Sequence, residues 1–356
     1  MQNKKRNFEE KLKILIDVFN IPLQEKWEKY LKDDYYNFFF YFDGLEVIEK
    51  NNFTYGKPET YKIEYNKFIQ KYFFKNEYYF ETGDLTGKKI VDVGCGWGIL
   101  TIWYALSGAK EIYAIGFAYQ IEFINRLIKR AKERKILDDS INIKAIAQPL
   151  EKNITKIGNL EFRSVECVYY NDVFEHLPDN IFMDALIASY NILKKGGKLI
   201  SLTHNTNNPF VLKRAKDWWT KVENESFISY RANIIKEKVS DISGENLEKM
   251  AASTRGLLTG DFYKAIYDFQ TTGDIPEPQK LMPAVNLTID YICENYISPP
   301  DVVNMMSDSG FKAHCYAALM HSRRLAIFQP LATIFKSLFM NINAFSQNVV
   351  FVGKKQ

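Results

Sequence analysis

A stretch of alternating glycines is the first place in this sequence where residue types and spacing suggest chemistry. It reads VDVGCGWGIL over residues 91–100, so Gly94, Gly96 and Gly98 follow Asp92 at every second position. Glycines at this spacing let the backbone turn sharply and approach another group closely. A helix that begins directly after the turn would add free backbone N–H donors. The stretch therefore predicts a site for a small polar ligand.

The glycine spacing also excludes two common phosphate sites. A dinucleotide fold carries G-x-G-x-x-G after its first strand, and this chain has Ile99 where the last glycine would stand. A phosphate loop needs Gly-Lys followed by Ser or Thr, and the turn lacks that sequence too. Without a pyrophosphate site, we expect a nucleoside-like ligand with a compact polar tail.

The elements that must position this turn alternate between apolar strands and amphipathic helices. The predicted elements are, in order, a strand at 88–94, a helix at 99–108, strands at 111–117 and 141–147 on either side of a helix at 120–135, a strand at 167–172, a helix at 180–195 closed by Gly196 and Gly197, a strand at 198–204, a helix at 299–311, and strands at 311–319 and 348–355. This alternation predicts an α/β fold with a seven-stranded, mainly parallel sheet. We expect the last two strands to pair antiparallel, because no clear crossover helix joins them.

Four regions follow from this pattern. They are a helical, aromatic N-terminal cap at 1–85, a cofactor-binding core at 86–204, a mainly helical insertion at 205–295 and a return to the core at 296–356. The cap and the insertion can each be a lid over a site or a structural layer. Trp218, Trp219 and Tyr230 of the insertion can stack on a ligand ring or pack inside the insertion.

Composition narrows the class of protein. The formal charge is +4, from 47 basic and 43 acidic side chains that are interleaved as in residues 129–139, which predicts solvated helix faces and no nucleic-acid partner. The four cysteines are widely spaced, so we expect neither a disulfide framework nor a metal site. The N-terminus does not resemble a signal peptide, and no apolar stretch reaches about 18 residues. We expect a cytoplasmic protein with no membrane span.

Motifs in a fixed order carry a resemblance to a known family. They are VDVGCGWG at 91–98, NDVFEHLPD at 171–179, LKKGGKLIS at 193–201 and ISPPDVVNMMSDSGF at 297–311. Together, over 88–204 and 296–356, they resemble class I S-adenosylmethionine-dependent methyltransferases. The resemblance implies a Rossmann-like fold, S-adenosylmethionine as the cofactor and methyl transfer as the reaction.

The resemblance also implies a set of cofactor-binding residues. The glycine turn would line the methionine part, Asp92 would fix the turn or reach the amino group through water, and Phe117 would lie near the adenine. The full set is Asp92, Gly94, Cys95, Gly96, Gly98, Gly116, Phe117, Gln148, Asn171 and Asp172.

Two positions depart from the family's pattern. The family usually ends its second strand with an acid that takes both ribose hydroxyls, and this chain has Gly116 there. Losing that acceptor would cost about 1.5–3 kcal/mol unless Gln120, Glu122 or a cap residue supplies the bond. Near the adenine amino group, Gln148 replaces the frequent acid, and its carbonyl can still accept a hydrogen bond. The departures imply a cofactor that is held differently or weakly.

Methyl transfer to a hydroxyl needs a base, whereas an amine acceptor needs only to arrive neutral. His204 at the end of the fifth strand is our first candidate for a base or an acceptor-positioning group, and His176 is the second. Each can also be structural, and His176 can merely shape the cofactor site. His314 and His321 lie within and just beyond the sixth strand.

The leading hypothesis is methyl transfer to a hydroxyl or amine of a small molecule, with a glycan or sugar precursor as one candidate. One alternative is a lipid-modifying enzyme of the cyclopropane type, whose glycine motif is similar and which also lacks the acid at the second strand. Another is a degenerate, non-catalytic binding module, which Gly116 favours. The sequence leaves the acceptor atom and the oligomeric state open.

Overall fold

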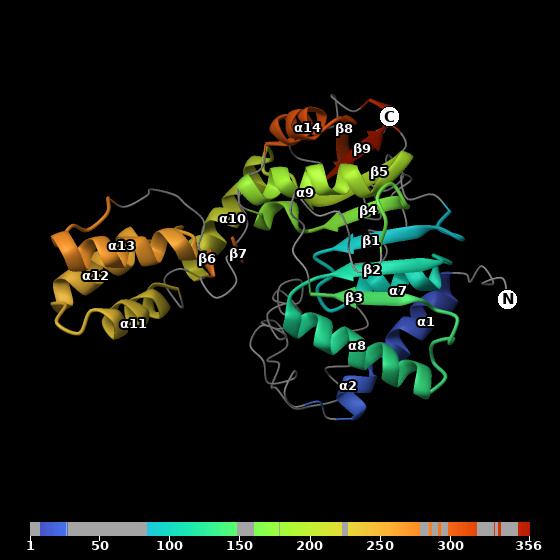
Figure 1. Cartoon of the computed structure of the whole chain (residues 1–356), viewed down its shortest axis with the longest axis horizontal. Coiled ribbons are helices and arrows are strands. Elements are labelled where there is room, and N and C mark those ends of the chain that lie inside the picture. The colour runs from blue at the N-terminus through green and yellow to red at the C-terminus, as the bar shows by residue number, and fades with distance from the viewer. Residues whose placement is uncertain are drawn as a thin grey trace.

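A mixed seven-stranded sheet forms the centre of the molecule (Figure 1). The computed structural model describes residues 8–25, 27, 84–147, 160–177, 179–222, 227–277, 285–286, 291–292, 298–318, 331, 334–335 and 348–356. The strand order is β3-β2-β1-β4-β5-β9-β8. The strands are β1 (Lys89–Val93), β2 (Glu111–Ile115), β3 (Ile143–Ile146), β4 (Val165–Asn171), β5 (Leu193–His204), β8 (Phe311–Ala318) and β9 (Asn348–Lys355).

Strand direction confirms the predicted α/β fold. The strands from β3 to β5 pair parallel, and β9 pairs antiparallel with both β5 and β8. The other six strands therefore point the same way, as in a Rossmann-like sheet. The antiparallel pairing of the last two strands is as expected from their connection.

Helices cover both faces of the sheet, because the central strands are apolar on both sides. The face that includes Ile90 and Tyr169 belongs to a buried cluster with α7, α8 and α1, and the face that includes Val91 and Tyr170 belongs to a cluster with α9 and α14. The helices around the sheet are α1 (Phe8–Phe19), α2 (Ile21–Gln24), α7 (Ile99–Leu106), α8 (Ala118–Glu133), η1 (Phe174–His176), α9 (Asp179–Ile192) and α14 (Pro299–Asp308).

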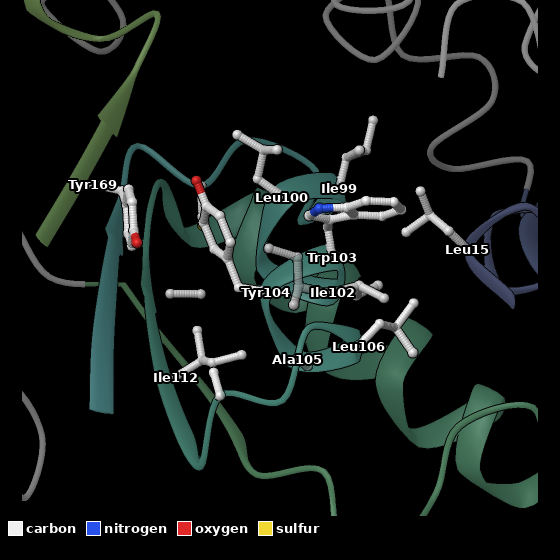
Figure 2. Close-up of a cluster of buried hydrophobic side chains, with 14 of the residues drawn as sticks. Leu15, Ile99, Leu100, Ile102, Trp103, Tyr104, Ala105, Leu106, Ile112 and Tyr169 are labelled. Carbon is white, nitrogen blue, oxygen red and sulfur yellow. The ribbon is translucent and has the colours of Figure 1, made fainter. Parts of the chain in front are cut away.

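Helix α7 lies between the sheet and the N-terminal helices, and every one of its residues is buried. Tyr104 stacks on Tyr169 of β4 at 4.5 Å between ring centroids, and Leu15 of α1 lies on the Trp103 side of the helix (Figure 2). Lys11 covers the Trp103 ring at 4.4 Å. The helix that follows the glycine turn is therefore held from both sides.

A separate group of helices extends from the sheet after β5 (Figure 1). It comprises α10 (Pro209–Val222), α11 (Ile228–Lys238), α12 (Gly244–Ser253) and α13 (Thr259–Thr272), and the short strands β6 (Val285–Asn286) and β7 (Tyr291–Ile292) follow it. Ile235, Met250 and Phe262 form a small core of their own in this group. Tyr230 is 41% exposed, so it does not pack in that core.

The predicted boundary between the helix at 180–195 and the fifth strand was wrong. Helix α9 ends at Ile192, and β5 begins at Leu193, before Gly196 and Gly197. The two glycines lie within the strand, where its register with β4 shifts between Val165 and Cys167. A Cβ on Gly197 would lie 2.9 Å from the Lys194 carbonyl oxygen, so the glycine allows this irregular pairing.

Candidate functional site

The glycine turn after β1 is a compact backbone structure. Gly94, Gly96 and Gly98 have φ angles of 66°, 51° and 84°, in the left-handed region that favours glycine. The Cys95 N–H donates to the Ile115 carbonyl at 2.9 Å, which fixes the turn to the end of β2. A Cβ on Gly94 would collide with the side chain of Val173, in the loop that follows β4. The turn therefore needs glycine for its conformation and for its close contact with that loop.

Asp92 lies beneath the turn and is 2% exposed. Its carboxylate accepts a 2.5 Å hydrogen bond from the Thr101 hydroxyl in the first turn of α7. Burial raises the pKa of Asp92 to about 7, while the hydrogen bond from Thr101 acts in the opposite direction. Burial, together with the nearby Asp92, also raises the pKa of the Cys95 thiol. Asp92 thus joins the strand to the helix and is poised to change its charge near neutral pH.

The end of β2 has no room for the acid that the family usually places there. A Cβ on Gly116 would lie 2.9 Å from the Cys95 Sγ and 3.2 Å from the Gln120 Oε1. Gln120 is buried, and its Oε1 accepts a hydrogen bond from the Phe117 N–H at 3.2 Å, which caps α8. Glu122, the other substitute suggested by the sequence, is exposed on α8. The space beside Gly116 is therefore filled by a thiol and an amide.

Aromatic rings line the chain where it leaves β2. Phe117 is half-buried, and its ring stacks on Tyr119 with centroids 5.9 Å apart and an interplanar angle of 8°. Tyr119 in turn meets the edge of the fully buried Trp97 at 5.8 Å. Phe117 thus stands at the carboxyl end of β2, beside the glycine turn.

The end of β4 places two polar residues next to the turn. The Asn171 side-chain amide donates to the Tyr104 hydroxyl at 2.8 Å, so α7 holds the orientation of this residue. Asp172 has a φ angle of 51°, which is uncommon for a residue other than glycine, and its N–H donates to the Leu202 carbonyl at 2.7 Å. Strained backbone of this kind is concentrated at ligand sites.

The two histidine candidates lie near the carboxyl ends of neighbouring parallel strands, β4 and β5. His176 ends the short helix η1 after β4, and His204 is the last residue of β5. The His204 Nδ1 lies 3.1 Å from the Oδ1 of Asn348, the first residue of β9. Because β9 is antiparallel to β5, its first residue lies beside the last residue of β5. The glycine turn, Asn171 and His204 therefore all lie at the carboxyl ends of the parallel strands.

Two residues of this edge escaped the sequence analysis. Asn348 begins the predicted last strand, and its place beside His204 depends on the register of an antiparallel pair formed by distant segments. Tyr104 lies within an apolar helical stretch, where nothing in the sequence distinguishes it from a core residue. A register deduced from the two strand ends could have indicated Asn348, whereas no sequence signal indicated Tyr104.

Other predicted residues lie elsewhere or outside the described part of the chain. His314 is inside β8, with its ring 6.3 Å from that of Tyr316. Gln148, His321, the side chains of Trp218 and Trp219, and the aromatic segments 35–44 and 65–80 fall outside the described residues. Among the residues that are described, no group of three or more His, Cys, Asp or Glu could hold a metal ion. In the same part of the chain, no helix is long and apolar enough to cross a membrane.

A family profile matches the segment that holds most of this edge. The profile is described as a methyltransferase domain, and it matches residues 65–254, more than half of the chain. The matched segment includes the glycine turn, Asn171, Asp172 and both histidine candidates.

Curated relatives match shorter segments. The chain is 26% identical to the ribosomal protein arginine N-methyltransferase rmt3 of Schizosaccharomyces pombe over 171 residues, which cover 48% of this chain and 30% of that protein. It is also 26% identical to the ubiquinone biosynthesis O-methyltransferase of Salmonella arizonae over 147 residues, which cover 41% of this chain and 52% of that protein. The matches thus span between about a third and about half of the length of these relatives.

Solved structures give a more distant likeness. The geranyl diphosphate C-methyltransferase of Streptomyces coelicolor, in complex with Mg²⁺, geranyl diphosphate and S-adenosyl-L-homocysteine, is 14% identical with a TM-score of 0.41. That match covers 85% of this chain and 84% of the other chain. A methyltransferase from Listeria monocytogenes has the same TM-score at 13% identity, with 81% of this chain and 99% of that chain covered.

Proposed function

This chain belongs to the methyltransferase-domain family, and we propose that it transfers a methyl group from S-adenosylmethionine to a hydroxyl or amine of a small molecule. The observation that carries the proposal is the position of His204. This imidazole lies at the carboxyl edge of the sheet, one strand away from Asn171 and two strands away from the glycine turn. Ligands of open α/β sheets bind at this edge.

The chemistry of the donor set supports S-adenosylmethionine, the cofactor of this family. Its amino-acid tail carries a carboxylate and an ammonium group. The backbone N–H groups of the first turn of α7 suit the carboxylate. Asn171 and Asp172 supply oxygen atoms that suit the ammonium group. Phe117 offers an apolar ring beside the turn, as an adenine requires. Gly116 supplies no carboxylate for the ribose, so binding that is weaker than usual is part of the proposal.

Methyl transfer is an in-line displacement at carbon, and the bound cofactor supplies a methyl group on a positively charged sulfur. The chain has to hold the acceptor in line, exclude water and, for a hydroxyl, remove a proton. We assign the last role to His204, whose neutral imidazole can take the proton as the new bond forms. Asn171, held by Tyr104, would keep the amino-acid end of the cofactor in place. His176 is the second candidate for the base.

A sugar or glycan precursor remains one candidate for the acceptor. The named relatives are an arginine N-methyltransferase and an O-methyltransferase, so they leave both an amine and a hydroxyl open. We place the reaction in the cytoplasm, on the composition of the chain. The proposal keeps the four regions that the sequence predicts. In it, the N-terminal cap (1–85) and the insertion (205–295) lie beside the site where the methyl acceptor binds.

A non-catalytic binding module is a second candidate, and the end of β2 favours it. The space where a ribose-binding acid would stand is occupied by the Cys95 thiol and the Gln120 amide. A chain that had lost its cofactor would be free to lose this acid as well. Cofactor binding therefore separates the two candidates.

Calorimetry with S-adenosylmethionine and S-adenosylhomocysteine tests the proposal first. We expect binding of both, followed by methyl release in a screen of sugars, nucleotides and lipids. No heat and no thermal shift at millimolar ligand would contradict the enzymatic function and support the binding module.

The His204→Ala variant then tests the role of the histidine. We expect turnover to fall by about a hundredfold while the affinity for S-adenosylhomocysteine stays within about twofold of wild type, because general-base catalysis contributes at least this much. A loss of cofactor affinity would instead place His204 in the cofactor site. The His176→Ala variant is the matched comparison, and a loss of turnover in that variant alone would assign the base to His176.

A further inference from the structure

We infer that Asn348 is a positioning residue for His204, which fixes the orientation of the imidazole and leaves its Nε2 as the basic nitrogen. The inference rests on the proposed function, because it assigns a partner to the base proposed there. It concerns a residue 144 positions away along the chain, which the pairing of β5 with β9 brings beside His204.

Strand pairing sets the geometry of the two residues. His204 and Asn348 are directly opposite partners in the antiparallel pair of β5 and β9. Residues in such positions have side chains on the same face with their Cβ atoms about 5 Å apart. Asn348 is also paired with Ala318 of β8 on its other side, so its backbone is held between two strands. Strand pairing on both sides therefore fixes the position from which the Asn348 side chain starts.

Burial adds to this constraint. Asn348 is 5% exposed, whereas His204 is half-buried, so the imidazole is the more accessible of the two side chains. A buried amide needs hydrogen-bond partners, and the 3.1 Å contact between its Oδ1 and the His204 Nδ1 supplies one. The two side chains therefore stabilise each other's orientation.

This contact determines which nitrogen of the imidazole carries the proton. An amide oxygen only accepts, so Nδ1 has to be the N–H donor in this pair. In a neutral imidazole the other nitrogen, Nε2, then holds the lone pair that can take a proton from an acceptor.

The tautomer can be measured in the cofactor-free protein by ¹⁵N NMR of labelled histidine, and His204→Gln identifies the signal. We expect wild type to show a protonated Nδ1 and an unprotonated Nε2. Asn348→Leu removes the acceptor and keeps the number of side-chain heavy atoms, and we expect it to yield a mixture of the two tautomers. Asn348→Asp keeps an acceptor oxygen, and we expect it to keep the Nδ1-protonated form. A protonated Nε2 in wild type, or an unchanged spectrum in Asn348→Leu, overturns the inference.

Kinetics give the second readout. We expect Asn348→Leu to lower kcat by about tenfold with little change in KM, and Asn348→Asp to restore most of the loss, since only the orientation and tautomer of the base are affected. Thr203→Val is the matched control, because Thr203 is the preceding residue of β5, is also buried, and faces the opposite side of the sheet. Its spectrum and kcat should match wild type.

The two readouts separate failure of the inference from failure of the proposed function. If wild type has the expected tautomer and Asn348→Leu changes it, but His204→Ala retains full turnover, the positioning holds and the base is another group. If His204→Ala loses turnover while Asn348→Leu keeps both the tautomer and kcat, His204 acts without Asn348, and the inference is wrong. Should Asn348→Leu fail to fold, Asn348→Ala also removes the acceptor, and an unchanged tautomer in that variant overturns the inference.

Discussion

The candidate site at the carboxyl ends of the parallel strands has two halves that are built in different ways: one beside β1 and β2, the other beside β5 and β9. At the ends of β1 and β2, the shape comes from the backbone, because Gly94 and Gly116 leave no space for larger side chains, and the Asp92 carboxyl is buried. At the end of β5 and the beginning of β9, the chemistry comes from two side chains, His204 and Asn348, which are opposite each other in the antiparallel pair.

The halves also differ in how far apart their partners lie in the sequence. Asp92 and Thr101 are nine residues apart, whereas His204 and Asn348 are 144 residues apart. A turn made by consecutive residues is specified locally, and a side-chain pair across strands is specified by the register of the sheet. We therefore expect the cofactor half to be rigid and intolerant of added atoms, and the acceptor half to tolerate changes of size while depending on hydrogen-bonding groups.

The largest expected effect tests the rigidity of the glycine turn. Gly94→Ala adds a Cβ at a φ of 66° and into the side chain of Val173, so we expect a loss of about 3 kcal/mol of unfolding free energy. Affinity for S-adenosylhomocysteine should fall as well. Gly87→Ala is the control, because Gly87 has a φ of 74° with nothing within 4 Å of the added Cβ, and it should lose only about 1 kcal/mol. If urea unfolding gives the same loss of unfolding free energy for both variants, the close contact between Gly94 and Val173 is contradicted.

A pH dependence tests whether the carboxyl beneath the turn is as buried as the structure indicates. The pKa of Asp92 is about 7 in the folded chain and near 3.8 when unfolded, so the folded state binds more protons between these values. The free energy of unfolding should therefore fall as pH rises from about 4 to about 7, by up to about 3 kcal/mol from this residue.

Asp92→Asn removes this ionisation at nearly constant shape. We expect the difference in unfolding free energy between the variant and wild type to change over that pH range in favour of the variant. Unfolding by urea at several pH values measures the difference. A difference that stays constant with pH would mean that the Asp92 carboxyl keeps an ordinary pKa, and it would weaken the contrast between the two halves.

The smallest expected effect concerns the coupling between Gly116 and Cys95. Gly116→Ala brings a Cβ to 2.9 Å from the Cys95 Sγ, and we expect a loss of about 1–2 kcal/mol from overpacking. Cys95→Ala removes the sulfur, so the double variant should lose less than the sum of the two single variants. A thermal double-mutant cycle measures this coupling. Additive losses would show that the thiol can move aside and that the end of β2 is less constrained than the distance indicates.

Much of the fold could be predicted because its signals are local. The apolar strands, the amphipathic α8 and the glycine turn each depend on neighbouring residues, and they confirm the predicted α/β sheet. The boundary near Gly196 and Gly197 was wrong because a glycine pair looks the same whether it ends a helix or accommodates an irregular strand pairing. That choice depends on contacts with Glu166 and its neighbours in β4.

The sequence by itself determined the type of sheet, the position of the turn and the absence of an acid after β2. Glycine spacing and side-chain periodicity depend only on residues that are neighbours in the chain. Tertiary structure alone decided that the space beside Gly116 is filled by Cys95 and Gln120 and that Tyr104 holds Asn171. It also decided that His204 meets Asn348, because an antiparallel strand brings its first residue to the edge where the parallel strands end. These contacts join segments through space, and no local pattern in the chain encodes their register.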